Sequence, residues 1–281
     1  MPNNTTIERL KNLVSYAIVW AALIIVLIPI VYTVRTSLIP APILFEMPPR
    51  WLFIPTQQAY ANLIYNEEFL AIIFHSLAIN LGSTALAVLL ALLASYAIVR
   101  YNFPIGRGIS YGILVMTSIP AVAIAIPVFV IYSRLGLYDT YLGMILIYTY
   151  VPIAFSLYLL WSFLQNIPKA TEEAAMIDGC TRLGAFLRIT LRLMAPGLAA
   201  TAVLTFMYTW SDFMYALILT SYNWRTIPVA ITQYLQPVRG PGSPWGPLAA
   251  GSVISIIPVA IFAYFAEKYL TKGFAIGGTK G

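Results

Sequence analysis

Residues 171–192, TEEAAMIDGCTRLGAFLRITLR, gather three acids and three arginines into 22 positions of an otherwise apolar sequence. Charged side chains at this density could dock a partner, meet lipid headgroups or perform acid–base chemistry. The chain holds one cysteine, Cys180, which excludes an internal disulfide framework and a multi-thiolate metal site. It holds one histidine, His75, which argues against a zinc cage or a histidine-based triad. We therefore expect no catalytic and no metal-binding residues in this chain.

The composition indicates that a bilayer is the main solvent of this chain. Hydrophobic residues make up 60% of the sequence and charged residues 9%, and the mean hydropathy is +0.83. Soluble domains usually carry about 25% charged residues. The net charge of +6 could suggest nucleic acid, but the basic residues are scattered between apolar runs. We expect a lipid environment and no nucleic-acid partner.

Six segments are long and apolar enough to cross a bilayer, which takes about 20 helical residues. They are roughly 13–34, 70–99, 109–133, 140–164, 197–220 and 247–267. The first apolar run is too long for the core of a signal peptide, and no small-residue cleavage pattern follows it, so we interpret it as a retained span. The sequence predicts an all-α membrane protein whose six transmembrane helices form a single domain, 1–281.

Lysine and arginine are distributed unevenly over the two sides that these spans define, and cytoplasmic loops carry the excess. Eleven lie on one side: Arg9, Lys11, Arg100, Arg107, Lys169, Arg182, Arg188, Arg192, Lys268, Lys272 and Lys280. Five lie on the other side: Arg35, Arg50, Arg134, Arg225 and Arg239. We therefore expect a multi-pass protein of the plasma membrane with both termini and the polar insert, 165–196, in the cytoplasm. Two long loops, 35–69 and 221–246, are expected outside.

The first half of the insert has the signals of a short helix. Thr171 can accept a hydrogen bond as its N-cap, and Glu172 and Glu173 then fall in the first turn, where the helix dipole favours acids. Gly179 can adopt the left-handed conformation that closes a helix. The pattern predicts a helix that begins after Thr171 and ends before Gly179.

The second half has the pattern of an amphipathic helix capped by Thr181 and limited by Pro196. Its apolar positions at helical spacing are Leu183, Phe186, Leu187 and Leu191. One interpretation is a helix on the inner leaflet, with its arginines on anionic lipid. That explanation does not suit the preceding acids, which anionic headgroups would repel. The alternative is a docking element for a cytoplasmic partner, with Glu173 and Asp178 at the contact.

The spacing E-A-A, three residues, then G resembles the signature loop of ABC importer membrane subunits. We use the name signature loop for residues 173–179, which include Glu173, Ala174, Ala175, Asp178 and Gly179. The family places an isoleucine ten residues after the glycine, as Ile189 stands here, and Leu191 also fits. It usually has proline next, where this chain has Arg192, and Pro196 is expected to take over the terminating role.

The resemblance extends over about 12–281 and is strongest to the smaller permease subunit of maltose- and trehalose-type sugar importers. The supporting stretches are PPRW (48–51), GLYDTYLGMIL (136–146), TWSDF (209–213) and LTKGFAIGGTKG (270–281). The resemblance implies a type I ABC importer permease fold with a cytoplasmic coupling helix, in a subunit that is not itself an enzyme. It implies four kinds of partner: a second permease, an ABC ATPase dimer, an extracytoplasmic sugar-binding protein and membrane lipid. This chain is expected to hold no cofactor, because ATP and Mg²⁺ bind the ATPase.

Among the acids of the predicted spans, Asp212 is the only one away from a span end, and an unpaired charge at that depth costs several kcal/mol. It could accept hydrogen bonds from sugar hydroxyls beside Tyr208, Trp210 and Ser211, since aromatic rings stack on the apolar faces of sugars. It could equally make a structural hydrogen bond to a neighbouring helix or to the second permease. Asn80 is a further candidate for the pathway.

Two other classes of protein remain to be compared with this interpretation. An ion-driven secondary carrier usually has several ionisable groups and paired halves at the midplane, which this sequence lacks. An intramembrane enzyme would need acid–base partners that one acid and one histidine do not supply. Within the importer interpretation the sequence does not name the solute, because glycerol-phosphate and oligosaccharide importers share this architecture. It also leaves open whether this subunit contacts the solute directly.

Overall fold

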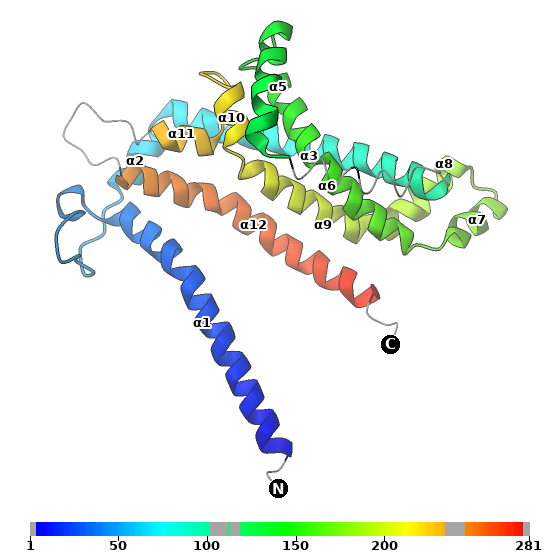
Figure 1. Cartoon of the computed structure of the whole chain (residues 1–281), viewed down its shortest axis with the longest axis horizontal. Helices are drawn as coiled ribbons and strands as arrows, with labels where there is room; N and C mark the ends of the chain where they lie inside the picture. The colour runs from blue at the N-terminus through cyan, green and yellow to red at the C-terminus, as the bar shows by residue number, and fades with distance from the viewer. Residues whose placement is uncertain (1–3, 102–111, 113–118, 234–244, 278–281) are drawn as a thin grey trace. The chain divides into compact units, whose positions relative to one another are not determined.

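The computed structural model describes residues 4–101, 112, 119–233 and 245–277, with backbone only for 4–7, 10 and 266–277. The described part is helical and contains no strand (Figure 1). Its elements are α1 (Asn4–Leu38), η1 (Ala41–Ile43), α2 (Gln58–Ile64), α3 (Glu67–Arg100), α5 (Ala121–Leu135), α6 (Tyr141–Gln165), α7 (Lys169–Ile177), α8 (Arg182–Ala185), the π-helical turn η2 (Phe186–Thr190), α9 (Leu191–Trp210), α10 (Met214–Leu219), α11 (Ile227–Gln233) and α12 (Trp245–Gly277).

Five helices of the described part are long and apolar enough to cross a membrane. They are Lys11–Leu38, Glu67–Arg100, Tyr141–Gln165, Arg182–Trp210 and Trp245–Phe265. The third predicted span, 109–133, falls partly outside the described residues, because 109–111 and 113–118 are not described, and its residues 121–133 lie in the shorter apolar helix α5.

The predicted span 197–220 is wrong as a single helix. Helix α9 ends at Trp210, a short break follows, and α10 begins at Met214. The backbone N–H of Ala216 donates to the carboxylate of Asp212 over 3.2 Å, so the Asp212 side chain satisfies an amide in the first turn of α10. A carboxylate that binds nearby amides competes with the helical hydrogen-bond pattern. This local competition explains why an apolar run of helical length contains two helices.

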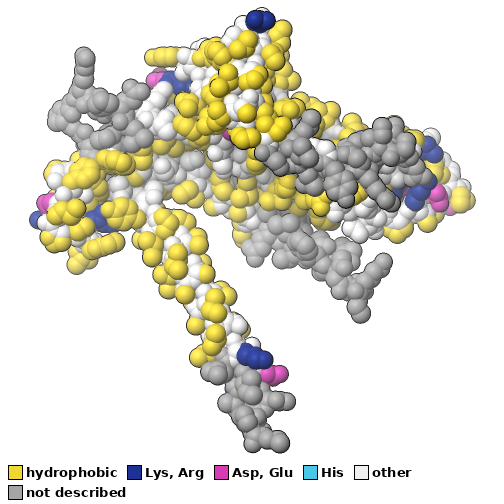
Figure 2. Space-filling view, viewed as in Figure 1, with side chains coloured by type: hydrophobic (Ala, Val, Ile, Leu, Met, Phe, Trp, Pro, Cys, Tyr) yellow, Lys and Arg dark blue, Asp and Glu magenta, His cyan; other side chains and the backbone are white. Residues whose placement is uncertain are grey.

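One compact unit comprises residues 1–67 and 231–255. Within it the Ser37 and Tyr60 hydroxyls share a hydrogen bond of 2.7 Å, which ties the end of α1 to α2. The Arg35 guanidinium donates to the Arg50 carbonyl over 2.6 Å. Most of α1 is exposed and apolar on its sides, with charges near its N-terminal end (Figure 2). A helix that is apolar all round and not covered by protein suits lipid contact.

The other unit comprises residues 68–230 and 256–281. Its principal helix pair is α6 and α9, where a Cβ added at Gly197 would lie 2.7 Å from the Phe163 ring. The glycine therefore permits close approach of the two helices. Ser156 and Thr205 share a hydrogen bond of 2.8 Å across the same contact. Two buried clusters complete the packing. One contains Ile79, Ala125, Met144, Ile147, Tyr148, Tyr215, Ala216, Leu219 and Val229, and the other Ala91, Leu92, Leu160, Leu164, Phe186 and Met194.

Candidate functional site

Helix α7 presents two different faces, and these divide the acids that the sequence places side by side. Glu172 and Ala175 are buried, three residues apart on one face. Glu173, Ala174 and Asp178 are exposed. Four residues before Glu173, Lys169 forms a loose surface ion pair with it at 3.9 Å, which contributes little stability. The exposed part of the signature loop is therefore available to a partner.

The end of α7 confirms the predicted left-handed glycine. Gly179 has φ +89°, a conformation that L side chains rarely adopt. The Cys180 amide donates to the Ala175 carbonyl over 2.9 Å, and the Gly179 amide donates to the Met176 carbonyl over 3.1 Å. These two bonds form a Schellman motif, which satisfies the last carbonyls of the helix. The motif fixes the turn at the end of the signature loop.

The prediction that Thr171 caps α7 is wrong. The helix begins at Lys169, directly after Pro168, and the Thr171 hydroxyl donates to the Pro168 carbonyl over 2.7 Å. Pro168 has φ −59° and ψ 133°, so its extended backbone sets the start of the helix. Thr171 consequently lies inside the first turn, where its hydroxyl bonds back to a carbonyl.

The second half of the insert begins as predicted and ends differently. Thr181 is an N-cap, because its hydroxyl oxygen accepts from the Gly184 amide over 3.1 Å. The chain then runs without interruption through α8, η2 and α9, with Pro196 inside α9. Pro196 therefore does not terminate the helix. A proline removes one donor, and neighbouring helices can offset that loss in a membrane.

The predicted apolar face of this segment is only partly covered in the structure. Phe186 is buried in the cluster with Leu160 and Met194, whereas Leu183 and Leu187 are exposed. The segment is thus the entry to α9 and does not form a separate surface helix. Its two exposed leucines are free to meet lipid or a partner.

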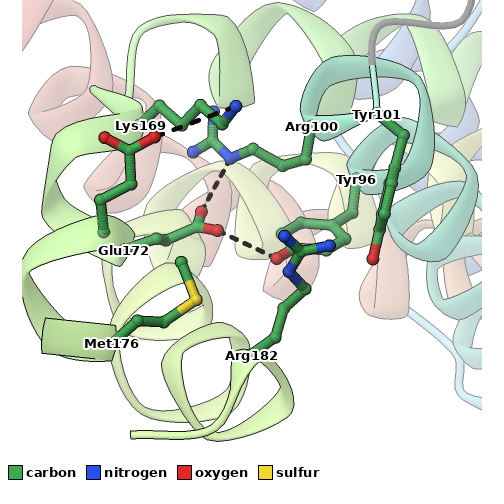
Figure 3. A pocket seen from close by; sticks show the side chains of 8 residues that line it. Tyr96, Arg100, Tyr101, Lys169, Glu172, Met176 and Arg182 are labelled. Carbon is green, nitrogen blue, oxygen red and sulfur yellow. Dashed lines mark hydrogen bonds and ion pairs between the residues drawn. The ribbon is translucent and has the colours of Figure 1, made fainter. Parts of the chain in front are cut away.

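Glu172 lies at the centre of a buried polar cluster that the sequence analysis did not identify (Figure 3). Its Oε1 accepts from Arg100 Nε over 2.8 Å and from Thr190 Oγ1 over 2.7 Å. Its Oε2 accepts from the Tyr96 hydroxyl over 2.9 Å. A second Arg100 nitrogen donates to the Ile167 carbonyl over 3.3 Å. The only local signal was the spacing of Glu172 and Ala175, because Arg100 is 72 positions away.

Burial by itself would raise the pKa of Glu172, since it penalises the charged carboxylate. The hydrogen bonds from Thr190, Arg100 and Tyr96, together with the positive charge of Arg100, outweigh that effect and leave the pKa below its usual range. Glu172 is therefore held as a carboxylate within a set of donors that satisfies both of its oxygens.

Asp212 lies in the break between α9 and α10 and contacts α6. Its carboxylate accepts from the Tyr148 hydroxyl over 3.0 Å, in addition to the Ala216 amide. Tyr148 is buried, with 1% of its surface exposed. These contacts supply the structural hydrogen bond that the sequence allowed as an alternative, and they leave the pathway role untested.

The other residues predicted beside Asp212 point to different surroundings. Trp210 is buried and stacks on Phe206, with ring centroids 5.4 Å apart. Tyr208 is exposed, and the Ser211 hydroxyl donates to the Met207 carbonyl over 2.8 Å. On α3, Asn80 is buried, and its side-chain amide donates to the Ser76 carbonyl over 2.7 Å.

On the predicted outer side, Asp139 holds the loop that follows α10. Its Oδ2 accepts from the amides of Tyr222 and Asn223, each over 3.0 Å, and from the Asn223 side chain. Its Oδ1 accepts from the Trp224 amide over 3.1 Å. The same loop is tied to α3, because Arg225 pairs with Glu68. The aromatic ring of Trp224 also packs at a tilt against Tyr141 of α6 and His75 of α3.

The described part of the chain is helical and has five long apolar helices, with one capped polar helix between two of them, as expected of a multi-pass membrane protein. Residues 84–275 match the family model of the binding-protein-dependent transport system inner membrane component, and the chain belongs to this family. It is therefore a transporter permease subunit and not an enzyme, as the sequence predicted. The membership also confirms the resemblance carried by the signature loop.

Its relatives include several carbohydrate permeases. It is 34% identical to the sulfoquinovosyl glycerol transport system permease protein SmoH of Agrobacterium fabrum, over 91% of this chain and 89% of that one. It is 33% identical to the trehalose/maltose transport system permease protein MalG of Thermococcus litoralis, over 92% and 93%. It is also 33% identical to the trehalose transport system permease protein SugB of Mycobacterium tuberculosis, over 79% and 81%.

Two solved structures share the fold. A chain of a bacterial ABC transporter for alginate import has a TM-score of 0.79 at 20% identity, over 96% of this chain and 99% of that one. A chain of the MetNI methionine ABC transporter has a TM-score of 0.56 at 16% identity, over 78% and 99%. The fold is that of the type I ABC importer permeases, as predicted.

Proposed function

We propose that this chain forms half of the translocation pathway of an ATP-driven sugar importer and that helix α7 is its contact with a separate ATPase. The observation that carries this proposal is the division of α7. Its inner face is fixed by Glu172 and Ala175, which are buried, while Glu173, Ala174 and Asp178 are exposed. Figure 1 shows α7 beyond the end of α6. A rigid helix with an exposed signature suits insertion into a socket on a partner.

The solute that we propose is a mono-, di- or oligosaccharide. Three relatives support this choice, because they belong to transport systems for sulfoquinovosyl glycerol, for trehalose, and for trehalose and maltose. Glycerol phosphate is the alternative solute within the same architecture. An ion-driven carrier mechanism has no support from the family to which the chain belongs.

The remaining partners follow from this role. A second permease would complete the pathway, an ATPase dimer would bind ATP and Mg²⁺ on the cytoplasmic side, and an extracytoplasmic protein would deliver the sugar. Nucleotide binding would move the packed permease helices as rigid bodies and so bias the direction in which the pathway opens. In this arrangement both termini of the chain are cytoplasmic, and lipid surrounds its apolar helices.

The test uses cells that express the complete transporter, with radiolabelled trehalose, maltose and glycerol 3-phosphate as probes. We expect uptake of a sugar that requires ATP and persists when ion gradients are dissipated but ATP is maintained. Uptake of glycerol 3-phosphate alone would replace the sugar assignment, and loss of transport with the ion gradient would contradict the importer.

The contact itself is tested by Glu173→Lys, which reverses the charge at the exposed signature. We expect the ATPase to be lost on purification of the permease and uptake to fall at least tenfold. Ala170→Lys is the matched control, because it places the same lysine side chain at an exposed position of α7 outside the signature loop. Wild-type retention of the ATPase by Glu173→Lys, with normal uptake, would show that α7 is not the coupling element.

A further inference from the structure

Glu172 connects α7 to three separate parts of the chain. It binds Tyr96 and Arg100 in the last turns of α3, and it binds Thr190 at the end of η2. Through Arg100 it also reaches the carbonyl of Ile167, in the connection between α6 and α7. These contacts all leave the buried face of α7, opposite the exposed signature. Figure 3 shows the Arg100 and Tyr96 side chains meeting at the Glu172 carboxylate.

The Glu172–Arg100 ion pair is enclosed, with 6% and 7% of the two side chains exposed. A buried ion pair seldom adds stability over an apolar pair of the same shape, because both charges lose their hydration. Removing one partner, however, leaves an unpaired buried charge and is strongly destabilising. Stability alone therefore does not explain why this ion pair is present. The pair does fix one arrangement of the surrounding side chains, because both carboxylate oxygens of Glu172 accept hydrogen bonds.

The segment that receives the Thr190 bond is itself unusual. Element η2 is a π-helical turn, a rare form that occurs mostly as single turns and frequently at functional sites. It continues directly into α9, which ends at Trp210 beside Asp212. A movement of Thr190 would therefore be carried along a continuous helix to the break at Asp212. The other partner of Glu172, Arg100, is the last residue of the 34-residue helix α3.

We propose that Glu172 is the positioning residue that fastens α7 to α3 and α9, so that a force on the exposed signature moves these helices as one body. The inference rests on the proposed contact between α7 and an ATPase. It assigns separate tasks to two adjacent acids. Glu173 meets the partner, and Glu172 transmits the movement into the membrane-spanning helices.

The inference is tested by measuring whether α7 and α3 keep their separation when the assembled transporter binds nucleotide. In a Cys180→Ser background, spin labels are placed at Ala170 of α7 and Leu93 of α3, two exposed positions outside the cluster. Double electron–electron resonance then gives their distance distribution without nucleotide and with ATP and vanadate. With Glu172 intact, we expect one narrow distribution that does not shift between the two states.

Glu172→Gln keeps the shape of the side chain and removes the charge that pairs with Arg100. We expect its distance distribution to broaden or to shift when nucleotide binds, and uptake of the transported sugar probe to fall at least tenfold. The ATPase should remain bound, because Glu173, Ala174 and Asp178 are unchanged. If Glu172 served only to stabilise the fold, Glu172→Gln would lower the yield of the complex. The distance distribution between the two labels would then stay narrow in the molecules that assemble.

Thr190→Val is the milder variant, since it keeps the volume of a buried side chain and removes one hydrogen bond to Glu172. We expect an intermediate broadening and a two- to fivefold loss of uptake. If Glu172→Gln or Thr190→Val assembles normally and keeps the narrow distribution in both states, Glu172 does not fasten these helices. That result differs from failure of the proposed coupling contact, which would show as retention of the ATPase by Glu173→Lys.

Discussion

The Tyr148 hydroxyl lies 3.0 Å from the Asp212 carboxylate, and this hydrogen bond joins the middle of α6 to the break between α9 and α10. The same carboxylate accepts from the Ala216 amide and so begins α10. One acid thus holds two helices and starts a third. A displacement of α9 against α6 would strain this bond, which gives Asp212 a mechanical role whether or not it meets the solute.

Asp212→Asn separates these two roles, because it keeps the size and loses the charge. A hydrogen bond to a charged group contributes about 1.5–3 kcal/mol, so we expect lower thermal stability of the purified complex in both Asp212→Asn and Tyr148→Phe. If Asp212 only holds helices, the two variants should alter sugar uptake equally. A change of substrate preference in Asp212→Asn that Tyr148→Phe does not share would place Asp212 at the solute.

The Asp139 loop predicts a dependence on pH. Burial alone would raise the pKa of Asp139, but hydrogen bonds from the amides of residues 221–224 outweigh it and leave the pKa below the usual value. A lowered folded-state pKa means that the contribution to stability is complete above the unfolded value of about 3.9. It is lost as the pH falls through the lower folded value.

Hydrogen exchange at Tyr222 and Asn223 checks this prediction. Protection factors, corrected for the intrinsic rate, should be constant from about pH 7 to pH 5 and should fall below about pH 4. Asp139→Asn should lower protection from about pH 7 to pH 5, because the amide side chain offers one acceptor oxygen where the carboxylate offers two. Equal protection in Asp139→Asn and the wild type would show that the carboxylate does not hold the loop.

We expect a substitution of Gly179 to be tolerated according to how readily the new residue adopts the left-handed backbone conformation. Its φ of +89° costs other residues roughly 1 kcal/mol, and asparagine less than most. A Cβ at this position would meet no atom of the described chain within 4 Å, so any collision must come from a partner. We expect Gly179→Ala to insert normally and to lower retention of the ATPase severalfold, and Gly179→Asp to abolish it.

Gly179→Asn is the control for this series, because it is best able to keep the left-handed turn. It should retain more ATPase than Gly179→Asp, whose side chain is of similar size but charged. Equal retention by all three variants and the wild type would show that neither the turn nor the space around it matters for the contact. Membrane insertion is monitored by the yield of folded permease in detergent.

The expected orientation is checked by labelling in sealed cells with a membrane-impermeant maleimide. A cysteine at Tyr222, an exposed position of the 221–246 loop, should react from outside. The native Cys180, in the insert, should react only after the cells are opened. Reaction of Cys180 in sealed cells would invert the topology. Gly240, another position of the predicted outer loop, lies outside the described residues, so Tyr222 is the better site.

Local sequence signals determined the features that depend on neighbouring residues alone. Apolar runs of sufficient length predicted the long helices, because a bilayer selects length and composition rather than particular partners. The left-handed Gly179 and the Thr181 cap were predicted for a similar reason. Each requires only a backbone conformation or a hydrogen bond within three residues. The spacing of the signature loop was sufficient to indicate the family.

Tertiary structure decided which of two adjacent acids is buried. Glu172 and Glu173 have the same side chain and stand side by side, and the burial of Glu172 depends on partners distant in sequence, among them Arg100, 72 residues before it. The partnership of Tyr148 with Asp212 likewise joins positions 64 apart, on two different helical segments. A buried charge must find its partner wherever packing brings one within reach, and helical periodicity carries no information about residues on another helix.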